Sequence, residues 1–233
     1  MQRIVVLNPK GGSGKTTIAI NVASHYAQCG ERLVMMDYDP QGSSAHWLSK
    51  RQDNQPHIAL IAAFERDPRI TRAFQLRIPQ GTDRVVVDTP AALEANEIPD
   101  LIRGADKILV PVLPSDIDIH ACSRCVQNLL LVAKVRRDEN RLGIIANRVR
   151  RNTLIYQSLT RFLGTLNIPI VATLRDSQSY VRSAETGYGL AEMKAALVAE
   201  DWADWQSMFE WLESPTHHRA QGASVSPAAQ QRR

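Results

Sequence analysis

The chain has 233 residues, of which 44% are hydrophobic and 22% charged, with a formal net charge of +4. This composition is ordinary for a globular protein, and the length suffices for one sizeable α/β core, so we expect a single domain. No apolar run approaches the roughly 20 residues that span a bilayer, and the first residues read as a strand rather than a signal peptide. Three cysteines do not suggest a disulfide framework. We therefore expect a cytoplasmic protein, neither membrane-spanning nor secreted.

Short apolar runs rich in β-branched residues alternate with longer segments of helical periodicity. The predicted strands are Ile4–Leu7, Leu33–Met36, Val85–Val87, Ile108–Val112, Leu142–Ala146 and Ile168–Thr173. The predicted helices are Thr16–Cys29, Glu94–Arg103, Ile119–Val135, Thr153–Leu163 and Glu200–Leu212. The strands lack polar alternation, which is typical of a parallel sheet covered on both faces. This order predicts a doubly wound, mostly parallel α/β fold that binds its ligands at the carboxyl ends of the strands.

The last predicted helix has one apolar face, formed by Trp202, Trp205, Phe209 and Leu212. Its polar face is acidic, and anionic lipids would repel it, so we expect this helix to pack on its own domain rather than on a membrane. The sequence that follows is rich in Pro, Ser, Ala and Gln and contains arginines but no acid. We therefore expect one domain over residues 1–213 and a disordered basic tail over residues 214–233.

The strongest local signal is a strand, a glycine-rich turn and a helix in direct succession near the N-terminus. Gly11, Gly12 and Gly14 allow the backbone to curl so that successive N–H groups point at phosphate oxygens, and the following helix adds its positive N-terminal end. Lys15 would neutralise the β- and γ-phosphates, and the hydroxyl of Thr16 would serve as a Mg²⁺ ligand. The segment is therefore predicted to bind a nucleotide with Mg²⁺.

This loop departs from the standard motif G-x-x-x-x-G-K-[ST], because Pro9 stands where the first glycine would be. The segment Lys10-Gly-Gly-Ser-Gly-Lys-Thr-Thr instead resembles the deviant Walker A box of the ParA/MinD superfamily of P-loop ATPases. The resemblance implies that Lys10 reaches across an ATP-bound homodimer to phosphates held by the other subunit. It implies nucleotide contacts from the whole loop, namely Gly11, Gly12, Ser13, Gly14, Lys15, Thr16 and Thr17.

Carboxylates follow two further predicted strands. Asp37 and Asp39 lie in Asp-Tyr-Asp-Pro-Gln, which resembles the Walker A′ box, and the resemblance assigns Asp39 to alignment of the attacking water. Asp88 lies in Asp-Thr-Pro, which resembles Walker B, where the carboxylate holds a Mg²⁺-bound water. Thr16, Asp39 and Asp88 are thus the candidate magnesium residues, and Asn147 resembles the asparagine that superfamily members use against adenine.

The predicted chemistry is Mg²⁺-dependent hydrolysis of ATP to ADP and phosphate, in which charge neutralisation and in-line positioning do nearly all the work. The candidate catalytic residues are Lys10, Lys15 and Asp39. No covalent nucleophile is required.

The resemblance to short ParA proteins extends from residue 1 to about residue 194. In that family ATP closes a dimer, the dimer binds DNA without sequence preference, and a cargo-bound ParB-like or adaptor protein stimulates hydrolysis. The resemblance implies a nucleoid-associated ATPase that partitions or positions a cargo, such as a plasmid, a chromosome or a protein microcompartment like the carboxysome.

Charge is distributed unevenly along the chain. Residues 134–182 contain ten Lys or Arg against three acids, whereas residues 185–213 contain seven acids and one lysine. The basic stretch could meet a polyanion, or it could be an ordinary solvated surface. Our candidate DNA-binding residues are Arg148, Arg150, Arg151, Arg161, Arg175 and Arg182. Phosphate neutralisation by such residues would give affinity without sequence specificity.

Three alternatives within the same superfamily stay open. Cys122 and Cys125 form a C-x-x-C, as in Fe–S scaffold ATPases, but they lie in a predicted helix, where buried core thiols are the simpler interpretation. A MinD-like membrane-positioning ATPase would need a basic amphipathic helix, and the chain shows none at its end. A biosynthetic ligase would need a small-molecule pocket that the sequence does not identify.

Overall fold

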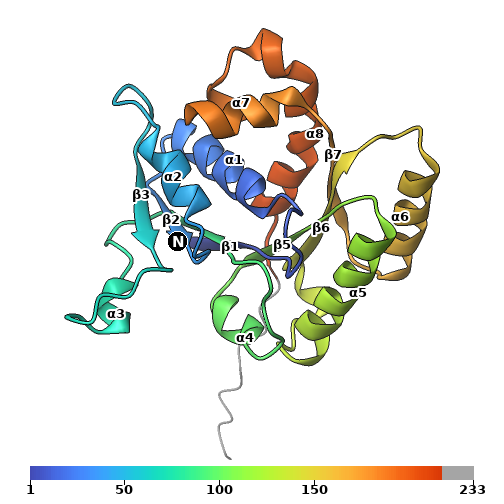
Figure 1. Cartoon of the computed structure of the whole chain (residues 1–233), viewed down its shortest axis with the longest axis horizontal. Helices are drawn as coiled ribbons and strands as arrows, with labels where there is room; N and C mark the ends of the chain where they lie inside the picture. The colour runs from blue at the N-terminus through green and yellow to red at the C-terminus, as the bar shows by residue number, and fades with distance from the viewer. Residues whose placement is uncertain (217–233) are drawn as a thin grey trace, which may run out of the picture.

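The structure is a computed structural model that describes residues 1–216. Within these residues one sheet contains seven strands in the order β3-β2-β4-β1-β5-β6-β7 (Figure 1). The strands are β1 Gln2–Val6, β2 Leu33–Asp37, β3 Ile58–Ala62, β4 Arg84–Asp88, β5 Lys107–Val112, β6 Leu142–Val149 and β7 Ile170–Arg175. All neighbouring strands pair in parallel. The predicted doubly wound parallel fold is therefore confirmed.

Helices connect the strands and cover both faces of the sheet (Figure 1). The α-helices of the described residues are α1 Lys15–Gln28, α2 Ser43–Ser49, α3 Arg72–Gln75, α4 Ile98–Leu101, α5 Asp116–Leu131, α6 Leu154–Thr165, α7 Gln178–Thr186 and α8 Ala195–Glu213. Two 3₁₀ turns, η1 Arg137–Glu139 and η2 Leu190–Glu192, complete the connections.

Alternate residues of the central strand β1 point to opposite faces of the sheet. Ile4 and Val6 belong to one apolar cluster, which includes residues of α1, α2, α7 and α8. Val5 and Leu7, which directly follows β1, belong to a second cluster, which includes residues of α4, α5 and α6. Because both faces are buried, the run from Ile4 to Leu7 is apolar at every position, as expected for a parallel sheet, whereas Gln2 and Arg3 at the start of β1 are only half-buried.

The apolar face of α8 packs against the first cluster, as predicted. Trp205 and Leu212 are fully buried and Phe209 is buried, while Trp202 packs partly buried beside them. Among residues 1–216, no helix combines the length and the apolarity needed to cross a bilayer. Residues 217–233, which make up most of the predicted tail, lie outside the described residues.

Several elements were missed or misplaced by the sequence interpretation. The edge strand β3 and the short helices α2, α3 and α7 were not predicted. Strand β3 is apolar but has only five residues, and the three helices have four to nine residues, which is too short to show a clear period. The helix predicted over Glu94–Arg103 is reduced to the single turn of α4, where Pro99 lies in the first turn. The strand predicted over Ile168–Thr173 is displaced to Ile170–Arg175, because Pro169 has no N–H to donate to the ladder.

The bounds of helices α5 and α8 also differ from the predicted ones. Helix α5 begins at Asp116 rather than Ile119, since the side chain of Ser115 caps the N–H of Asp118, and it ends at Leu131 rather than Val135. Helix α8 begins at Ala195, five residues before the predicted start at Glu200.

Candidate active site

The strand order brings the three predicted motifs to one edge of the sheet. Strand β4 lies between β1 and β2, and Asp88 pairs in register with Val6 on one side and with Asp37 on the other. The glycine-rich loop follows β1 directly. The loop and both carboxylates therefore meet at the carboxyl ends of three adjacent strands, where a doubly wound sheet binds its ligands.

The glycine-rich loop is anchored at its start by the buried side chain of Asn8. Its Nδ2 donates to the carbonyl oxygen of Pro111 at 2.6 Å, and its Oδ1 accepts from the backbone N of Lys10 at 2.9 Å. Gly12 and Gly14 have φ values of 76° and 92°, in the left-handed region that favours glycine. Helix α1 begins immediately after Gly14, so its N-terminus faces the loop.

Asn147, at the carboxyl end of β6, braces this loop from the neighbouring side. Its Nδ2 donates to the carbonyl oxygen of Ser13 at 2.8 Å, and its Oδ1 accepts from the backbone N of Arg148 at 3.0 Å. A Cβ at position 14 would lie 2.2 Å from that Nδ2, so only glycine fits there. The sequence interpretation missed this bracing role, and the predicted adenine contact of Asn147 stays a prediction.

Lys15 lies between the loop and the carboxylates. Its side chain is buried, and its Nζ donates to the carbonyl oxygen of Lys10 at 3.3 Å. Burial lowers the pKa of Lys15, while the nearby Asp88 and Asp39 act to raise it. The ammonium group therefore lies within electrostatic range of the predicted magnesium residue Asp88 and of the predicted catalytic residue Asp39.

Asp88 is fully buried at the end of β4. Burial raises its pKa to about 7, while the nearby hydroxyls of Ser44 and Thr16 act in the opposite direction. The Oγ of Ser44 donates to Oδ2 at 2.5 Å, but Oδ1 has no hydrogen-bond partner within residues 1–216. Burying a carboxylate oxygen without a hydrogen-bond partner costs free energy. The position of this oxygen therefore indicates a site where a bound ligand would supply the partner.

Asp37 fixes the loop that carries Asp39. Its buried carboxylate accepts from the backbone N of Asp39 and of Ala45, each at 3.0 Å. Asp39 is half-buried, and its Oδ1 accepts from the backbone N of Gln41 at 3.0 Å. The two ends of the loop are thus held on one buried carboxylate, which restricts where the side chain of Asp39 can point.

A cavity of about 570 Å³ opens beside these groups. Its walls include Gly11, Gly12, Gly14, Lys15, Thr16, Thr17, Asp39 and Asn147 among the predicted residues, together with Arg148. Asp88 lies behind Lys15 and Thr16 and is not part of the lining.

Helix α7 supplies a wall of this cavity that sequence reasoning did not anticipate, through Tyr180, Val181 and Ala184. A signal was present, because Ser177 caps the start of α7 and Gly187 follows its end with a φ of 73°.

Most of the predicted DNA-binding arginines are engaged within the chain. Arg148 and Arg150 lie 3.1 and 3.7 Å from the carboxylate of Asp176. Arg151 lies 2.9 Å from Asp204, and Arg175 pairs with Glu200 and Asp201. Only Arg161 and Arg182 of the six form no ion pair with another residue of the range 1–216. Arg161 lines a shallow surface groove with Arg151, Tyr156, Gln157 and Thr160.

The cysteine pair lies in α5 and faces the apolar cluster under that helix. Cys122 and Cys125 are 0% and 1% exposed. Burial raises the pKa of the Cys122 thiol to about 12 and shifts that of Cys125 in the same direction. These are core thiols, as the sequence favoured, and the described residues contain no group of three or more His, Cys, Asp or Glu placed to hold a metal ion.

Known proteins are similar to this chain in sequence. A maintenance of carboxysome distribution protein A from Gloeobacter kilaueensis is 30% identical over 217 residues, which cover 90% of this chain and 93% of that protein. The chromosome-partitioning ATPase Soj of Thermus thermophilus is 27% identical over 188 residues, covering 68% of this chain and 74% of Soj.

Solved structures show the same fold at lower identity. Apo McdA from Cyanothece has a TM-score of 0.69 and 17% identity, with 91% of this chain and 98% of McdA covered. MinD from Aquifex aeolicus has a TM-score of 0.61 and 19% identity, with 91% and 95% covered. The family model for the CobQ/CobB/MinD/ParA nucleotide binding domain matches residues 4–190. Because this match spans well over half of the sequence, the chain belongs to the CobQ/CobB/MinD/ParA nucleotide-binding family.

Proposed function

We propose that this chain is a ParA-type ATPase that binds ATP and Mg²⁺ and uses hydrolysis to position a cargo over the nucleoid. The observation that carries the proposal is the placement of Lys15. It lies at the wall of a cavity, beside a glycine-rich loop, and close enough to Asp39 and Asp88 for both carboxylates to act on its pKa. The similarity to a carboxysome distribution protein over nearly its whole length supports the positioning role.

The loop residues fit a triphosphate. The left-handed glycines and the N-terminus of α1 turn backbone N–H groups toward one concave surface. We assign phosphate contacts to Gly11, Gly12, Ser13, Gly14, Lys15, Thr16 and Thr17, and a contact with adenine to Asn147. That last contact would have to coexist with the hydrogen bond between Asn147 and Ser13.

Three residues would hold Mg²⁺: Thr16 through its hydroxyl, Asp88 through a water molecule, and Asp39 at the open side. The buried Oδ1 of Asp88, which has no hydrogen-bond partner within residues 1–216, fits this assignment, because a hydrated cation supplies a hydrogen-bond donor. The bound cation supplies charge neutralisation on the transferred phosphoryl group.

Asp39 is assigned to the orientation of the attacking water. Because Asp37 holds the backbone of residue 39 in place, the carboxylate of Asp39 is preorganised rather than free to rotate with its loop. Lys15 stabilises negative charge on the transferred group, and the products are ADP and inorganic phosphate.

The homodimer is proposed through Lys10. Its side chain is half-buried and forms no ion pair with a carboxylate of residues 1–216. Its ammonium group is therefore available to phosphates bound by a second subunit, as the deviant Walker A box implies. Dimerisation would then depend on ATP.

The proposed DNA-binding role rests on arginines that form no ion pair within residues 1–216. Arg161 and Arg182 are exposed and lack ion-pair partners within residues 1–216, so they are the first candidates for phosphate contacts. The other four candidates would have to leave their carboxylate partners in order to bind a DNA phosphate, namely Arg148, Arg150, Arg151 and Arg175. A cargo-bound ParB-like or adaptor protein is the proposed stimulating partner.

The alternatives find less support. The thiols of an Fe–S scaffold would need to reach a shared cluster, whereas Cys122 and Cys125 are buried in the core. A membrane anchor would need an exposed apolar helix face, whereas that of α8 is covered by the domain.

Retention on immobilised nonspecific duplex DNA tests the function. We expect binding with ATP and Mg²⁺, none with ADP or without nucleotide, and a loss of at least about tenfold in affinity between 50 and 200 mM salt. Binding in no nucleotide state would leave the nucleotide site intact and would contradict the positioning role.

A further inference from the structure

Helix α2 touches both buried carboxylates of the site. It begins one residue after Gly42, at the end of the loop that carries Asp39. The backbone N of Ala45 donates to Asp37, and the Oγ of Ser44 donates to Asp88. Any displacement of α2 would therefore move the loop of Asp39 and the hydroxyl that contacts Asp88.

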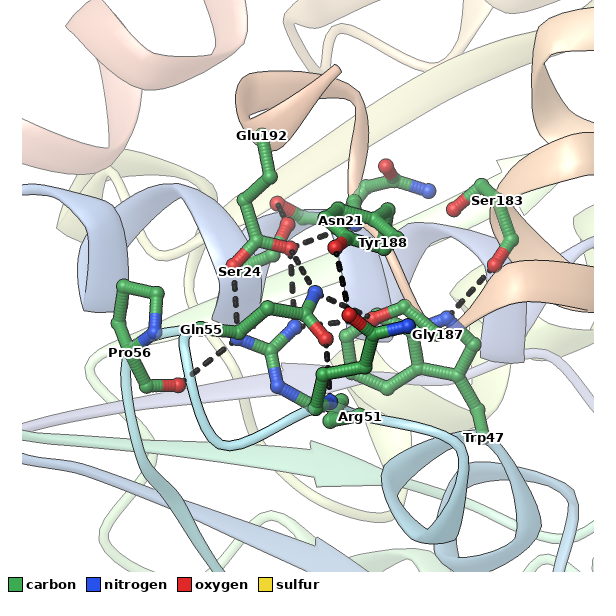
Figure 2. A network of polar contacts seen from close by, with 12 residues as sticks. Asn21, Ser24, Trp47, Arg51, Gln55, Pro56, Ser183, Gly187, Tyr188 and Glu192 are labelled. Atoms are coloured by element: carbon green, nitrogen blue, oxygen red, sulfur yellow. Dashed lines mark hydrogen bonds and ion pairs between the residues drawn. The ribbon is translucent and has the colours of Figure 1, made fainter.

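The other end of α2 is attached to α7, which forms a wall of the cavity. The Nε1 of Trp47 donates to the carbonyl oxygen of Ser183 at 2.8 Å, and the Nζ of Lys50 donates to that of Ala184 at 2.9 Å (Figure 2 shows the first contact). These carbonyls belong to the last turn of α7, whose negative end favours a cation. The contacts join the loop of Asp39 to the opposite wall of the cavity.

A buried ion pair completes this attachment (Figure 2). The guanidinium of Arg51 forms two parallel hydrogen bonds with the carboxylate of Glu192, at 2.6 and 2.9 Å. Their side chains are only 7% and 4% exposed. Arg51 also donates to the carbonyl oxygens of Gly187 and Pro56, and Glu192 accepts from the backbone N of Gly189.

This ion pair fixes geometry more than it adds stability. The desolvation cost of a buried pair often cancels its Coulombic gain, whereas two parallel hydrogen bonds specify one orientation. The surroundings leave little room for another arrangement, because a Cβ at Gly187 would lie 2.8 Å from the backbone of Lys50. On the far side, Asn21 of α1 accepts from the backbone N of Leu190, which ties the same turn to the helix of the glycine-rich loop.

We propose that Arg51 and Glu192 are positioning residues, which hold α2 so that Asp39 stands at a fixed place relative to the α7 wall of the nucleotide cavity. The proposal deepens the function given above and rests on it. Neither residue touches the cavity, so each acts through α2 and the loop of Asp39.

The test compares Glu192→Gln with Glu213→Gln. Both substitutions remove one charge from a carboxylate that an arginine contacts, but Glu213 pairs with Arg84 at the opposite end of the sheet. For each variant, kcat is measured by phosphate release with ATP and Mg²⁺, affinity by titration with a fluorescent ATP analogue, and folding by thermal melting.

We expect Glu192→Gln to lower kcat about 5- to 20-fold with less than a threefold change in affinity, because a small misplacement of Asp39 slows the chemistry more than it weakens binding. Glu213→Gln should keep the wild-type kcat even if its Tm falls. Equal kcat values in both variants would overturn the proposal.

If Glu192→Gln does not fold, Lys50→Met removes one donor from the same attachment and should lower kcat in the same direction. An unchanged kcat there would also overturn the proposal. A wild-type protein that binds but does not hydrolyse ATP would instead contradict the proposed function itself.

Discussion

Strand β4 begins at Arg84 and ends at Asp88, and the charged side chains at its two ends differ in how fully their polar atoms are paired. At the amino end, Arg84 pairs with Glu31 and Glu213 and lies 3.8 Å over the ring of Tyr26. At the carboxyl end, the buried Asp88 keeps one oxygen without a partner within residues 1–216. The comparison indicates that the charged groups at the amino end stabilise the fold, whereas the carboxyl end retains a hydrogen-bond acceptor for a ligand.

Two buried lysines repeat this contrast. Lys107, at the start of β5, donates to Asn140 and Ser214 and lies 4.2 Å from the ring centre of Trp211. Lys15, at the start of α1, faces the cavity, and its one hydrogen bond from Nζ within residues 1–216 is a long one to a carbonyl oxygen of its own loop. The ammonium group of Lys107 therefore has its partners within the fold, whereas the ammonium group of Lys15 can contact a ligand in the cavity.

The largest expected effect separates these two lysines. Lys15→Ala should raise the Kd for ATP by at least about 100-fold, because the charge that neutralises the β- and γ-phosphates is lost. Lys107→Met should leave the Kd within about twofold. Equilibrium titration with a fluorescent ATP analogue measures both, and normal affinity in Lys15→Ala would refute the assignment of the loop.

The pH dependence of the free energy of unfolding tests whether Lys107, at the amino end of β5, is buried as the structure shows. Burial lowers the pKa of Lys107 to about 8, so between pH 8 and its ordinary value near 10.5 the unfolded state binds more protons than the folded state. Wild-type stability should therefore rise with pH across this window relative to Lys107→Met, by an amount on the order of 2 to 3 kcal/mol.

Denaturant unfolding of both proteins at pH 7.5 and pH 10 measures this difference. The comparison between the two proteins is needed because burial also raises the pKa values of Cys122 and Cys125. These thiols make the free energy of unfolding fall with rising pH in both proteins, and the comparison cancels their effect. A difference that does not change with pH would show that Lys107 titrates as an exposed lysine.

A smaller effect concerns the exposed arginines. Arg161→Glu and Arg182→Glu should each weaken ATP-dependent DNA binding by about tenfold at low salt, because each loses a phosphate contact and gains a repulsive charge. Arg32→Glu, at the amino end of β2, should have little effect. Filter binding at 50 mM salt is the measurement, and unchanged affinity for both test variants would move the DNA surface elsewhere.

The parts of the site that were predictable depend on local sequence. Glycines at fixed spacing between a strand and a helix can be read directly, and so can acidic residues that follow apolar strands, because the backbone conformation is set by the nearest neighbours. The loop, Asp39 and Asp88 were accordingly placed correctly at the carboxyl edge of the sheet.

The parts that were missed depend on contacts between distant residues. Helix α2 is short, and its position is set by Trp47 reaching Ser183 and by Arg51 reaching Glu192, more than 130 residues away. The bracing role of Asn147 and the ion pairs of Arg148 and Arg151 likewise arise only when the chain has folded. No periodicity in the sequence encodes such contacts.

The most direct test of the central claim is phosphate release by the wild type and by Asp39→Ala, each with ATP and Mg²⁺ under identical conditions. If the carboxyl end of the sheet is the hydrolytic site, Asp39→Ala should bind ATP normally and lose hydrolysis by about 100-fold or more. Sustained turnover in Asp39→Ala would contradict the assignment of this carboxylate and, with it, the account of how the site works.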